Sequence, residues 1–162
     1  MKAESDLGGH YKSPRLTPVG LAKWIDVLND TIIGHDDDWL AAQLVAARSF
    51  NSREDYTRKD TGKTYSRVVH PVHAAQQLAE GEFNRYYLRG LCRRAKEAGI
   101  EYLIVYRGKA VERPRPESEA MIGHHISVDE LLAALRSNDF VSIEDALKVP
   151  GGPNSGLTAR LP

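Results

Sequence analysis

Four basic residues recur at helical spacing near the centre of the chain, within the segment GEFNRYYLRGLCRRAKEAG (residues 81–99). If this segment is a helix, steps of four, four and three positions place all four side chains on one side of it. Guanidinium and ammonium groups bind phosphates and carboxylates. The spacing therefore predicts a surface for nucleic acid or for an acidic protein, here named the basic ridge: Arg85, Arg89, Arg93 and Lys96.

The basic ridge has a third interpretation, which is a solvated helix face. Glu80, Glu82 and Glu97 alternate with the arginines at spacings of three and four. Such pairs are common on exposed helices and contribute only a few tenths of a kcal/mol, by a rough estimate. The sequence leaves these three interpretations open.

A second group of cations lies upstream, in REDYTRKDTGKTYSRVV (residues 53–69). Two runs with β-forming residues flank the turn sequence Asp60-Thr61-Gly62, which predicts a basic β-hairpin. With the ridge, its cations would contact several phosphates, and Tyr56, Tyr65 and Tyr86 would stack on bases. The hairpin cations predicted to make these contacts are Arg53, Arg58, Lys59, Lys63 and Arg67.

The formal net charge is zero, but the charges are unevenly distributed. Residues 53–115 hold 14 Lys and Arg against 8 Asp and Glu, whereas residues 1–52 hold 5 against 7 and residues 116–162 hold 3 against 7. A basic centre attracts nucleic acid, but basic and acidic segments in one chain also favour head-to-tail pairing between copies.

No catalytic motif is present. TGKT at residues 61–64 lacks the earlier glycine of a phosphate-binding loop, since Thr57 occupies that position. VYRG at 105–108 and ESE at 117–119 resemble signatures of ADP-ribosyltransferases, but the strand that separates them in that family has no room here. An enzyme of unrecognised class remains the third functional alternative.

Metal and cofactor chemistry has little support in the sequence. His70 and His73 are three positions apart and are the candidate metal ligands, but no Cys or further His lies at tight spacing with them. No cofactor is expected. The single cysteine, Cys92, excludes an intramolecular disulfide and fits a reducing compartment. No apolar run suits a membrane span or a signal core, so we expect a cytoplasmic protein.

The hydrophobic pattern predicts one α+β domain, mostly helical, over residues 18–149. An N-terminal αα-hairpin begins with Thr17 as N-cap and Pro18 in the first turn. The β-hairpin follows, and then one long central helix that begins at Pro71 and ends near Gly99. A buried strand, IEYLIVYRG, comes next, and a helix with Ser127 and Glu130 at capping-box spacing follows it.

The two ends are predicted to be polar arms, residues 1–17 and 150–162. Their composition is typical of disordered segments, which become ordered most easily on a neighbouring subunit. The C-terminal tail would make that contact through Asn154, Leu157, Arg160 and Leu161.

One resemblance covers residues 68–162. The segments HPVHAAQQLAEGEFNRYYLRGLCRRAKEAGIEYLIVYRGK, RPRPESEAMIG and PGGPNSGLTARLP are similar to small uncharacterised proteins of phage or prophage-type structural gene clusters in high-GC bacteria. The resemblance implies a virion or head-assembly context, with no activity, cofactor or site to transfer.

From these patterns we predict a non-enzymatic structural or assembly component of a larger multi-subunit particle. Its partners would be other copies or other subunits, contacted through the basic ridge and the arms, and it would reside in the cytoplasm or in a virion. The first alternative is a nucleic-acid-binding accessory protein that uses the ridge and the hairpin.

Overall fold

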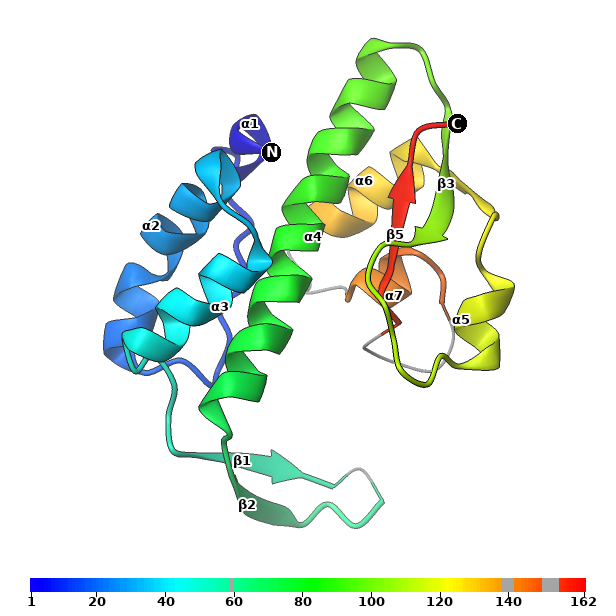
Figure 1. The fold of residues 1–162 in the computed structure, drawn as a ribbon. Helices are drawn as coiled ribbons and strands as arrows, with labels where there is room; N and C mark the ends of the chain where they lie inside the picture. Colours follow the sequence, from blue (N-terminus) through cyan, green and yellow to red (C-terminus); the bar gives the residue numbers. More distant parts are fainter. Residues whose placement is uncertain (59, 138–141, 150–154) are drawn as a thin grey trace. The chain divides into compact units, whose positions relative to one another are not determined.

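The predicted α+β, mostly helical fold is confirmed by the computed structural model, which describes residues 1–58, 60–137, 142–149 and 155–162 (Figure 1). Lys59 and Asn154, two predicted contact residues, lie outside the described residues. The chain divides into two compact units. Unit 1 comprises residues 1–9 and 84–162, and unit 2 comprises residues 10–83.

Unit 2 begins with the predicted αα-hairpin of α2 (Pro18–Gly34) and α3 (Asp37–Ala46). The side chain of Thr17 accepts a hydrogen bond from the Gly20 amide at 3.0 Å and so caps α2. Asp36 caps α3 in the same way, accepting from Trp39 N at 2.9 Å. The apolar stripes that hold the helices together include the buried side chains Trp24, Leu28, Leu40 and Leu44.

The β-hairpin of unit 2 consists of β1 (Arg53–Thr57) and β2 (Thr64–Val68), paired antiparallel. Gly62 adopts a φ of +66° in the connection, a left-handed conformation that glycine adopts without strain. The hairpin extends away from α2 and α3, and every residue of β2 is exposed (Figure 1). After Val69 the chain enters α4 (Pro71–Glu97), within which the two units meet in sequence.

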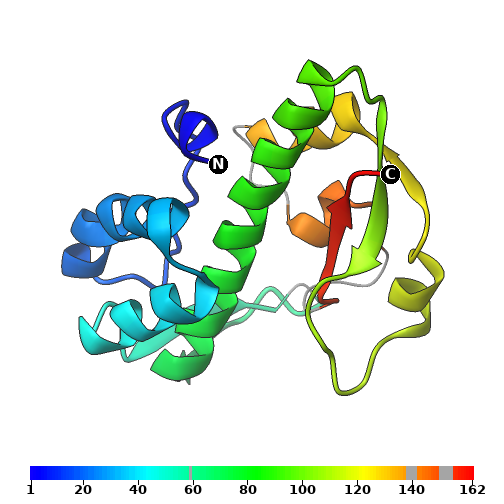
Figure 2. The same cartoon turned by 45° about the horizontal axis from the view of Figure 1, so that its top comes forward.

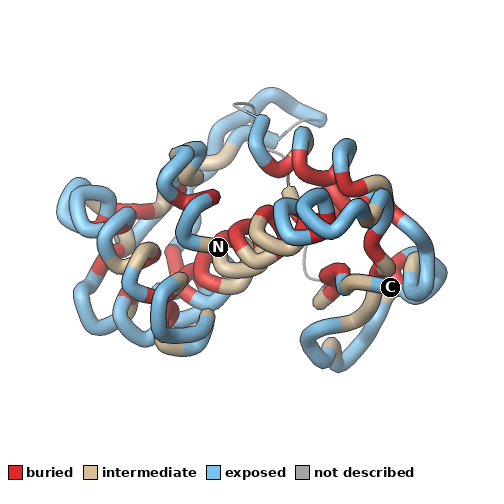
Figure 3. The backbone as a smooth tube through the Cα atoms, turned by 90° about the horizontal axis from the view of Figure 1, so that it is seen from above, coloured by how far each residue is buried: buried red, intermediate tan, exposed pale blue. Residues whose placement is uncertain are grey.

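Unit 1 is built on a three-stranded antiparallel sheet. β3 (Tyr102–Arg107) is the central strand, between β4 (His125–Ser127) and β5 (Leu157–Arg160) (Figure 2). Its core includes side chains of α4, α6 (Val128–Arg136) and α7 (Ile143–Ala146), and Figure 3 marks the buried backbone along α4 and α6. Ser127 caps α6, as its spacing to Glu130 predicts.

The C-terminal segment differs from the predicted tail, because residues 155–162 pack on their own unit. Leu157, Thr158 and Ala159 are buried, and β5 pairs with β3 along its whole length. Asn84 holds this strand in place: its Nδ2 donates to the Leu157 carbonyl at 3.2 Å, and its Oδ1 accepts from Thr158 Oγ1 at 2.7 Å. A strand of four residues has too short an alternation to be recognised in sequence.

The N-terminal segment is also not a free arm. α1 (Lys2–Ser5) belongs to unit 1, where Glu4 and Ser5 are buried. Residues 10–17 belong to unit 2, in which Trp24 Nε1 donates to the Tyr11 carbonyl at 2.8 Å. The sequence also predicted an irregular connection where α5 (Pro116–Ala120) and β4 form. No helix in the described part of the chain is long and apolar enough to cross a membrane.

Two helical glycines give opposite predictions for unit 2. A Cβ on Gly20 would overlap the backbone of Ser49, whereas a Cβ on Gly81 would meet nothing within 4 Å. We expect Gly20→Ala to lower the free energy of unfolding by about 2 kcal/mol through overpacking. Gly81→Ala should raise it by about 0.5–1 kcal/mol, because alanine favours the helix. Urea denaturation measures both changes, provided that the slope of the free energy of unfolding against urea concentration is the same in each variant. A Gly20→Ala variant with the stability of wild type would contradict the close contact.

Candidate anion-binding surface on the β-hairpin

The structure breaks up the basic ridge, because two of its four side chains are buried. Arg85 is 4% exposed and Arg89 is 1% exposed, while Arg93 and Lys96 are exposed. The prediction of one continuous contact surface is therefore wrong. The buried side chains Tyr86, Leu88 and Cys92 alternate with the arginines along this part of α4, and no residue from 85 to 92 is exposed.

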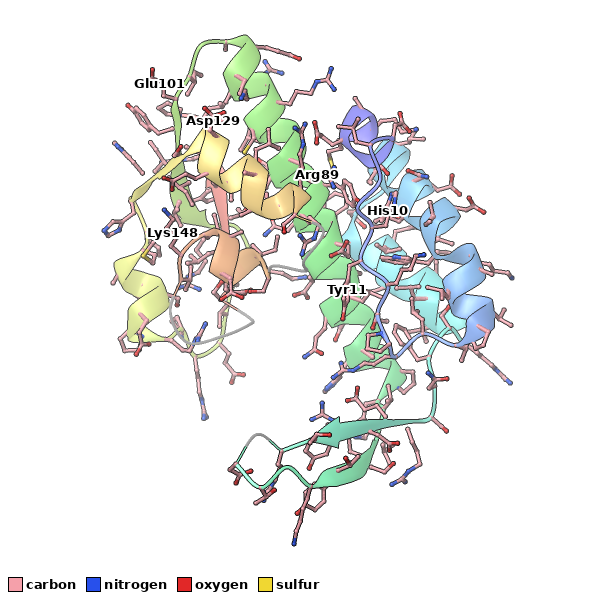
Figure 4. The ribbon with its side chains drawn as sticks, turned by 180° about the vertical axis from the view of Figure 1, so that it is seen from behind. His10, Tyr11, Arg89, Glu101, Asp129 and Lys148 are labelled. Carbon is pink, nitrogen blue, oxygen red and sulfur yellow. The ribbon has the colours of Figure 1, made fainter. Side chains whose placement is uncertain are left out.

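The buried arginine at position 89 binds the N-terminal segment of unit 1. Arg89 Nε lies 3.2 Å from Glu4 Oε2, and its terminal nitrogens donate to the carbonyls of Glu4 at 2.9 Å and Gly8 at 3.1 Å (Figure 4). Arg136 of α6 joins the same carboxylate at 3.0 Å and 2.5 Å. Arg85 donates to the Leu135 carbonyl at 3.5 Å. These contacts are structural, inside unit 1.

The carboxyl group of Glu4 is fully buried, yet it is held in its charged form. Burial raises its pKa, but the hydrogen bonds and charges of Arg136 and Arg89 outweigh burial and leave the pKa below its ordinary value of 4.5. The same pairing raises the pKa of Arg136. Glu4, Arg89 and Arg136 therefore form an ionic cluster with a buried carboxylate at its centre, here named the Glu4 cluster.

The two exposed ridge residues pair with carboxylates nearby. Arg93 Nε lies 3.2 Å from Glu97 Oε1, one helical turn away, and Lys96 pairs with Asp129 of α6. All four side chains are about half exposed or more. Exposed pairs of this kind contribute about 0–1 kcal/mol. The solvated-face interpretation therefore describes this end of α4.

The hairpin places its aromatic and basic side chains together on one face. Directly opposite residues share a face and successive residues alternate, so the register Glu54↔Arg67 and Tyr56↔Tyr65 puts these four on the same side. Beyond the strand ends the ladder continues, with Arg58 N donating to the Lys63 carbonyl at 3.0 Å. We name this side the cationic face: Glu54, Tyr56, Arg58, Lys63, Tyr65 and Arg67.

Four of these side chains are in mutual contact, and we name them the Arg–Tyr ladder. The rings of Tyr56 and Tyr65 stack with centroids 5.8 Å apart. The Arg67 guanidinium carbon lies 4.8 Å from the centroid of Tyr56, and that of Arg58 lies 5.3 Å from the centroid of Tyr65. Each cation–π contact at an exposed site contributes about 0.5–1 kcal/mol. The ladder therefore helps to stabilise a hairpin that two strands alone would leave marginal.

One carboxylate is part of the cationic face, and two arginines neutralise it. Glu54 accepts from Arg15 Nε at 2.7 Å and from Arg67 Nε at 2.6 Å, and Arg15 also donates to Gln77 at 3.0 Å. The hydrogen bond from Arg15 is the largest influence on Glu54 and lowers its pKa against the opposing effect of burial; Arg67 lowers it further. The face thus keeps an excess of positive charge.

The opposite face of the hairpin has a different character. It carries Arg53, Asp55 and Val68 with small hydroxyl residues, so its formal charges cancel. Arg53 Nε donates across the strands to Ser66 Oγ at 3.1 Å. Arg53 therefore does not join the other predicted hairpin cations, and the candidate surface is the cationic face alone.

The remaining sequence candidates do not come together as a site. The rings of His70 and His73 are exposed, with centroids 6.2 Å apart. Within the described residues no three His, Cys, Asp or Glu side chains are grouped to hold a metal. Cys92 is buried, and burial raises its pKa to about 12, which leaves the thiol protonated. Tyr86 is fully buried and cannot stack on a base.

The arginine of VYRG and the acidic segment after it do meet, in a structural ion pair. Arg107 Nη2 lies 2.5 Å from Glu119 Oε1 and 3.4 Å from Ser118 Oγ, and Arg107 also donates to the Ser155 carbonyl. These bonds join β3 to α5 and to the residues before β5. They hold α5 and residue 155 against the end of β3 within unit 1.

Sequence reasoning missed Arg15 as a member of the hairpin site. It lies 39 positions before Glu54, in a segment that was assigned to an arm, and no local pattern connects the two. Comparison with known proteins gives no further guidance, since no protein-family model matches the chain and neither curated proteins nor solved structures include a significant match.

The Glu4 cluster predicts a stability change that depends on pH. Glu4→Gln leaves two guanidiniums without their carboxylate and should lower the free energy of unfolding by about 3 kcal/mol at pH 7. The folded pKa of Glu4 lies below the unfolded one, so the charged carboxylate stabilises above about pH 4.5, and this is lost as pH falls through the folded pKa. Urea denaturation at several pH values should therefore show the difference from wild type narrowing in acid.

The matched control for this prediction is Glu97→Gln. This substitution removes the exposed carboxylate that pairs with Arg93, which lies on α4 as Arg89 does. It should change the free energy of unfolding by less than about 0.5 kcal/mol. Equal effects of the two substitutions would contradict a special role for the buried carboxylate.

Proposed function

We propose that the chain is a non-enzymatic nucleic-acid-binding protein whose contact surface is the cationic face of the β-hairpin. One observation carries the proposal: strand register gathers Arg58, Lys63 and Arg67 with both hairpin tyrosines on one exposed side. Two-stranded ribbons are a known way to approach nucleic acid, and an exposed row of cations attracts phosphates.

The size of the face sets the expected strength of binding. Each cation that neutralises a phosphate of a single strand releases bound counterions, with a slope of about −0.7 in log affinity against log salt concentration. Arg15 and Arg67 share the single charge of Glu54, so with Arg58 and Lys63 they leave an excess of three positive charges, which gives a slope of about −2. Binding of this kind is weak and independent of sequence, with a Kd of about 10⁻⁴ to 10⁻⁶ M.

The corrected positions of the other candidates support this choice over the ridge and the arms. Arg85 and Arg89 are committed to contacts inside unit 1, and residues 157–160 to a strand of its sheet. Neither is available to a partner without loss of fold. The hairpin needs no such loss, because Arg58, Lys63 and Arg67 on its cationic face are exposed.

The proposal predicts that Arg58→Glu with Lys63→Glu weakens binding to a labelled single-stranded DNA at least tenfold. Opposite charges on the face repel phosphates, so the salt slope should also fall toward about −1 or less. Fluorescence anisotropy at several salt concentrations measures both quantities. Arg67 is left unchanged because it neutralises Glu54.

The control is Arg94→Glu with Arg113→Glu, which makes the same change in net charge at exposed positions of unit 1. It should change the affinity less than twofold. If both pairs weaken binding equally, the contact is not specific to the hairpin. If the wild-type chain does not bind at all, the proposed function is wrong.

The assembly function predicted from the sequence remains a second candidate, and an exposed apolar stripe on α2 favours it. Leu21 is 39% exposed, and Ile25, one turn further along the helix, is 38% exposed. Ile32, two turns beyond Ile25, continues the stripe and is half-buried. Val19 and Ile33, at the two ends of α2, are both more than 60% exposed but lie outside this stripe. Clustered exposed apolar side chains are typical of subunit interfaces.

If α2 joins subunits, light scattering should give a mass that is a multiple of the 18.0 kDa chain. Ile25→Glu should reduce that mass, because a carboxylate cannot be buried there at low cost. Ile122→Glu is the control, since Ile122 is similarly exposed at 41% but lies in unit 1. A monomer at all concentrations would exclude this candidate for the chain alone.

A further inference from the structure

We infer that the ligand of the cationic face is the phosphate backbone itself, and that the tyrosines hold the arginines in place without stacking on bases. This inference rests on the proposed nucleic-acid contact and specifies its chemistry. Tyrosines beside cations would ordinarily suggest base stacking, which was the sequence-based expectation for Tyr56 and Tyr65. The geometry of the Arg–Tyr ladder instead favours phosphate binding by the arginines, with the tyrosines holding the guanidinium groups in position.

Both tyrosine rings are already engaged within the hairpin. Tyr56 stacks on Tyr65 at 5.8 Å, and each ring also has a guanidinium over it, at 4.8 Å for Arg67 and 5.3 Å for Arg58. A base that stacked on either ring would have to displace a guanidinium or part the two rings. Base stacking on this face therefore competes with the contacts that stabilise the hairpin.

The guanidinium groups, in contrast, keep donors for a ligand while they lie over the rings. A guanidinium has five N–H donors, and contact with a ring face does not provide these donors with hydrogen-bond acceptors. Arg67 uses Nε for Glu54, which leaves its terminal nitrogens for a phosphate. Their position over the tyrosines reduces the side-chain entropy that binding would otherwise cost.

It follows that the bases are dispensable for binding. A deoxyribose-phosphate strand without bases should bind nearly as well as an oligonucleotide of the same length, and inorganic polyphosphate should compete with both. Because phosphates carry no sequence information, homopolymers of different bases should bind with equal affinity. These consequences separate phosphate recognition from base stacking.

The experiment compares three ligands of equal length: oligo-dT, an abasic strand and inorganic polyphosphate. Each is titrated against the wild-type chain by anisotropy or by competition. We expect the abasic strand to bind within threefold of oligo-dT and polyphosphate to displace both. An abasic strand that binds more than tenfold more weakly than oligo-dT would overturn the inference and leave the proposed function intact, whereas no binding of oligo-dT would overturn both.

Two variants test the role of the rings. Tyr56→Leu with Tyr65→Leu removes the aromatic rings of the ladder but keeps residues suited to a strand. It should lower the affinity for all three ligands by the same factor, about fivefold. Tyr56→Phe with Tyr65→Phe keeps the rings and should bind as wild type does. A leucine variant that weakens oligo-dT alone would show base stacking and overturn the inference. The wild-type ligand comparison does not depend on the folding of either variant.

Discussion

The buried carboxylate of Glu4 is the constraint on which unit 1 depends. It brings together α1, α4 and α6, whose residues lie 85 and 132 positions apart in sequence, around one negative charge. Removing the Glu4 carboxylate and the Arg89 guanidinium from water is costly, and the cost is offset only when both keep their partners; Arg136 adds its charge from a position that is 40% exposed. Residues 1–9 therefore cannot leave as an arm, because their departure would leave Arg89 buried beside the core without a carboxylate.

The same constraint explains why the basic ridge was a wrong prediction although its helix was a right one. Helical spacing is a local property, and it correctly indicated that Arg85, Arg89, Arg93 and Lys96 share a helix. Whether an arginine faces solvent depends on what folds against it, and for Arg89 that is a glutamate from the N-terminal segment of the chain. A buried arginine and an exposed one have the same spacing pattern, so periodicity alone cannot distinguish them.

Local sequence patterns predicted the strands of the hairpin but not the face on which each side chain lies. Turn chemistry at Asp60-Thr61-Gly62 and the β-forming residues on either side predicted both strands and most of the contact residues. The register, which the sequence did not give, decides that Arg53 lies on the other face while Arg58 and Arg67 lie over the tyrosines. Arg15 could not be found from the hairpin sequence at all, since its contact with Glu54 depends on the packing of residues 10–17 in unit 2. β5 was missed for a related reason: its stability comes from pairing with β3 and not from its own composition.

Burial and ion pairing also leave only part of the positive charge in the centre of the chain, residues 53–115, unpaired at the surface. Arg85 and Arg89 are buried, and Arg93, Lys96 and Arg107 each face a carboxylate. On the hairpin, Asp55 lies on the opposite face, and Glu54 is shared between two arginines. At 0.1 M salt, exposed charges separated by more than about 10 Å are largely screened from one another. A partner at the cationic face therefore responds to the residues of that face and not to the net charge of zero, and a neutral chain can present a surface suited to a polyanion.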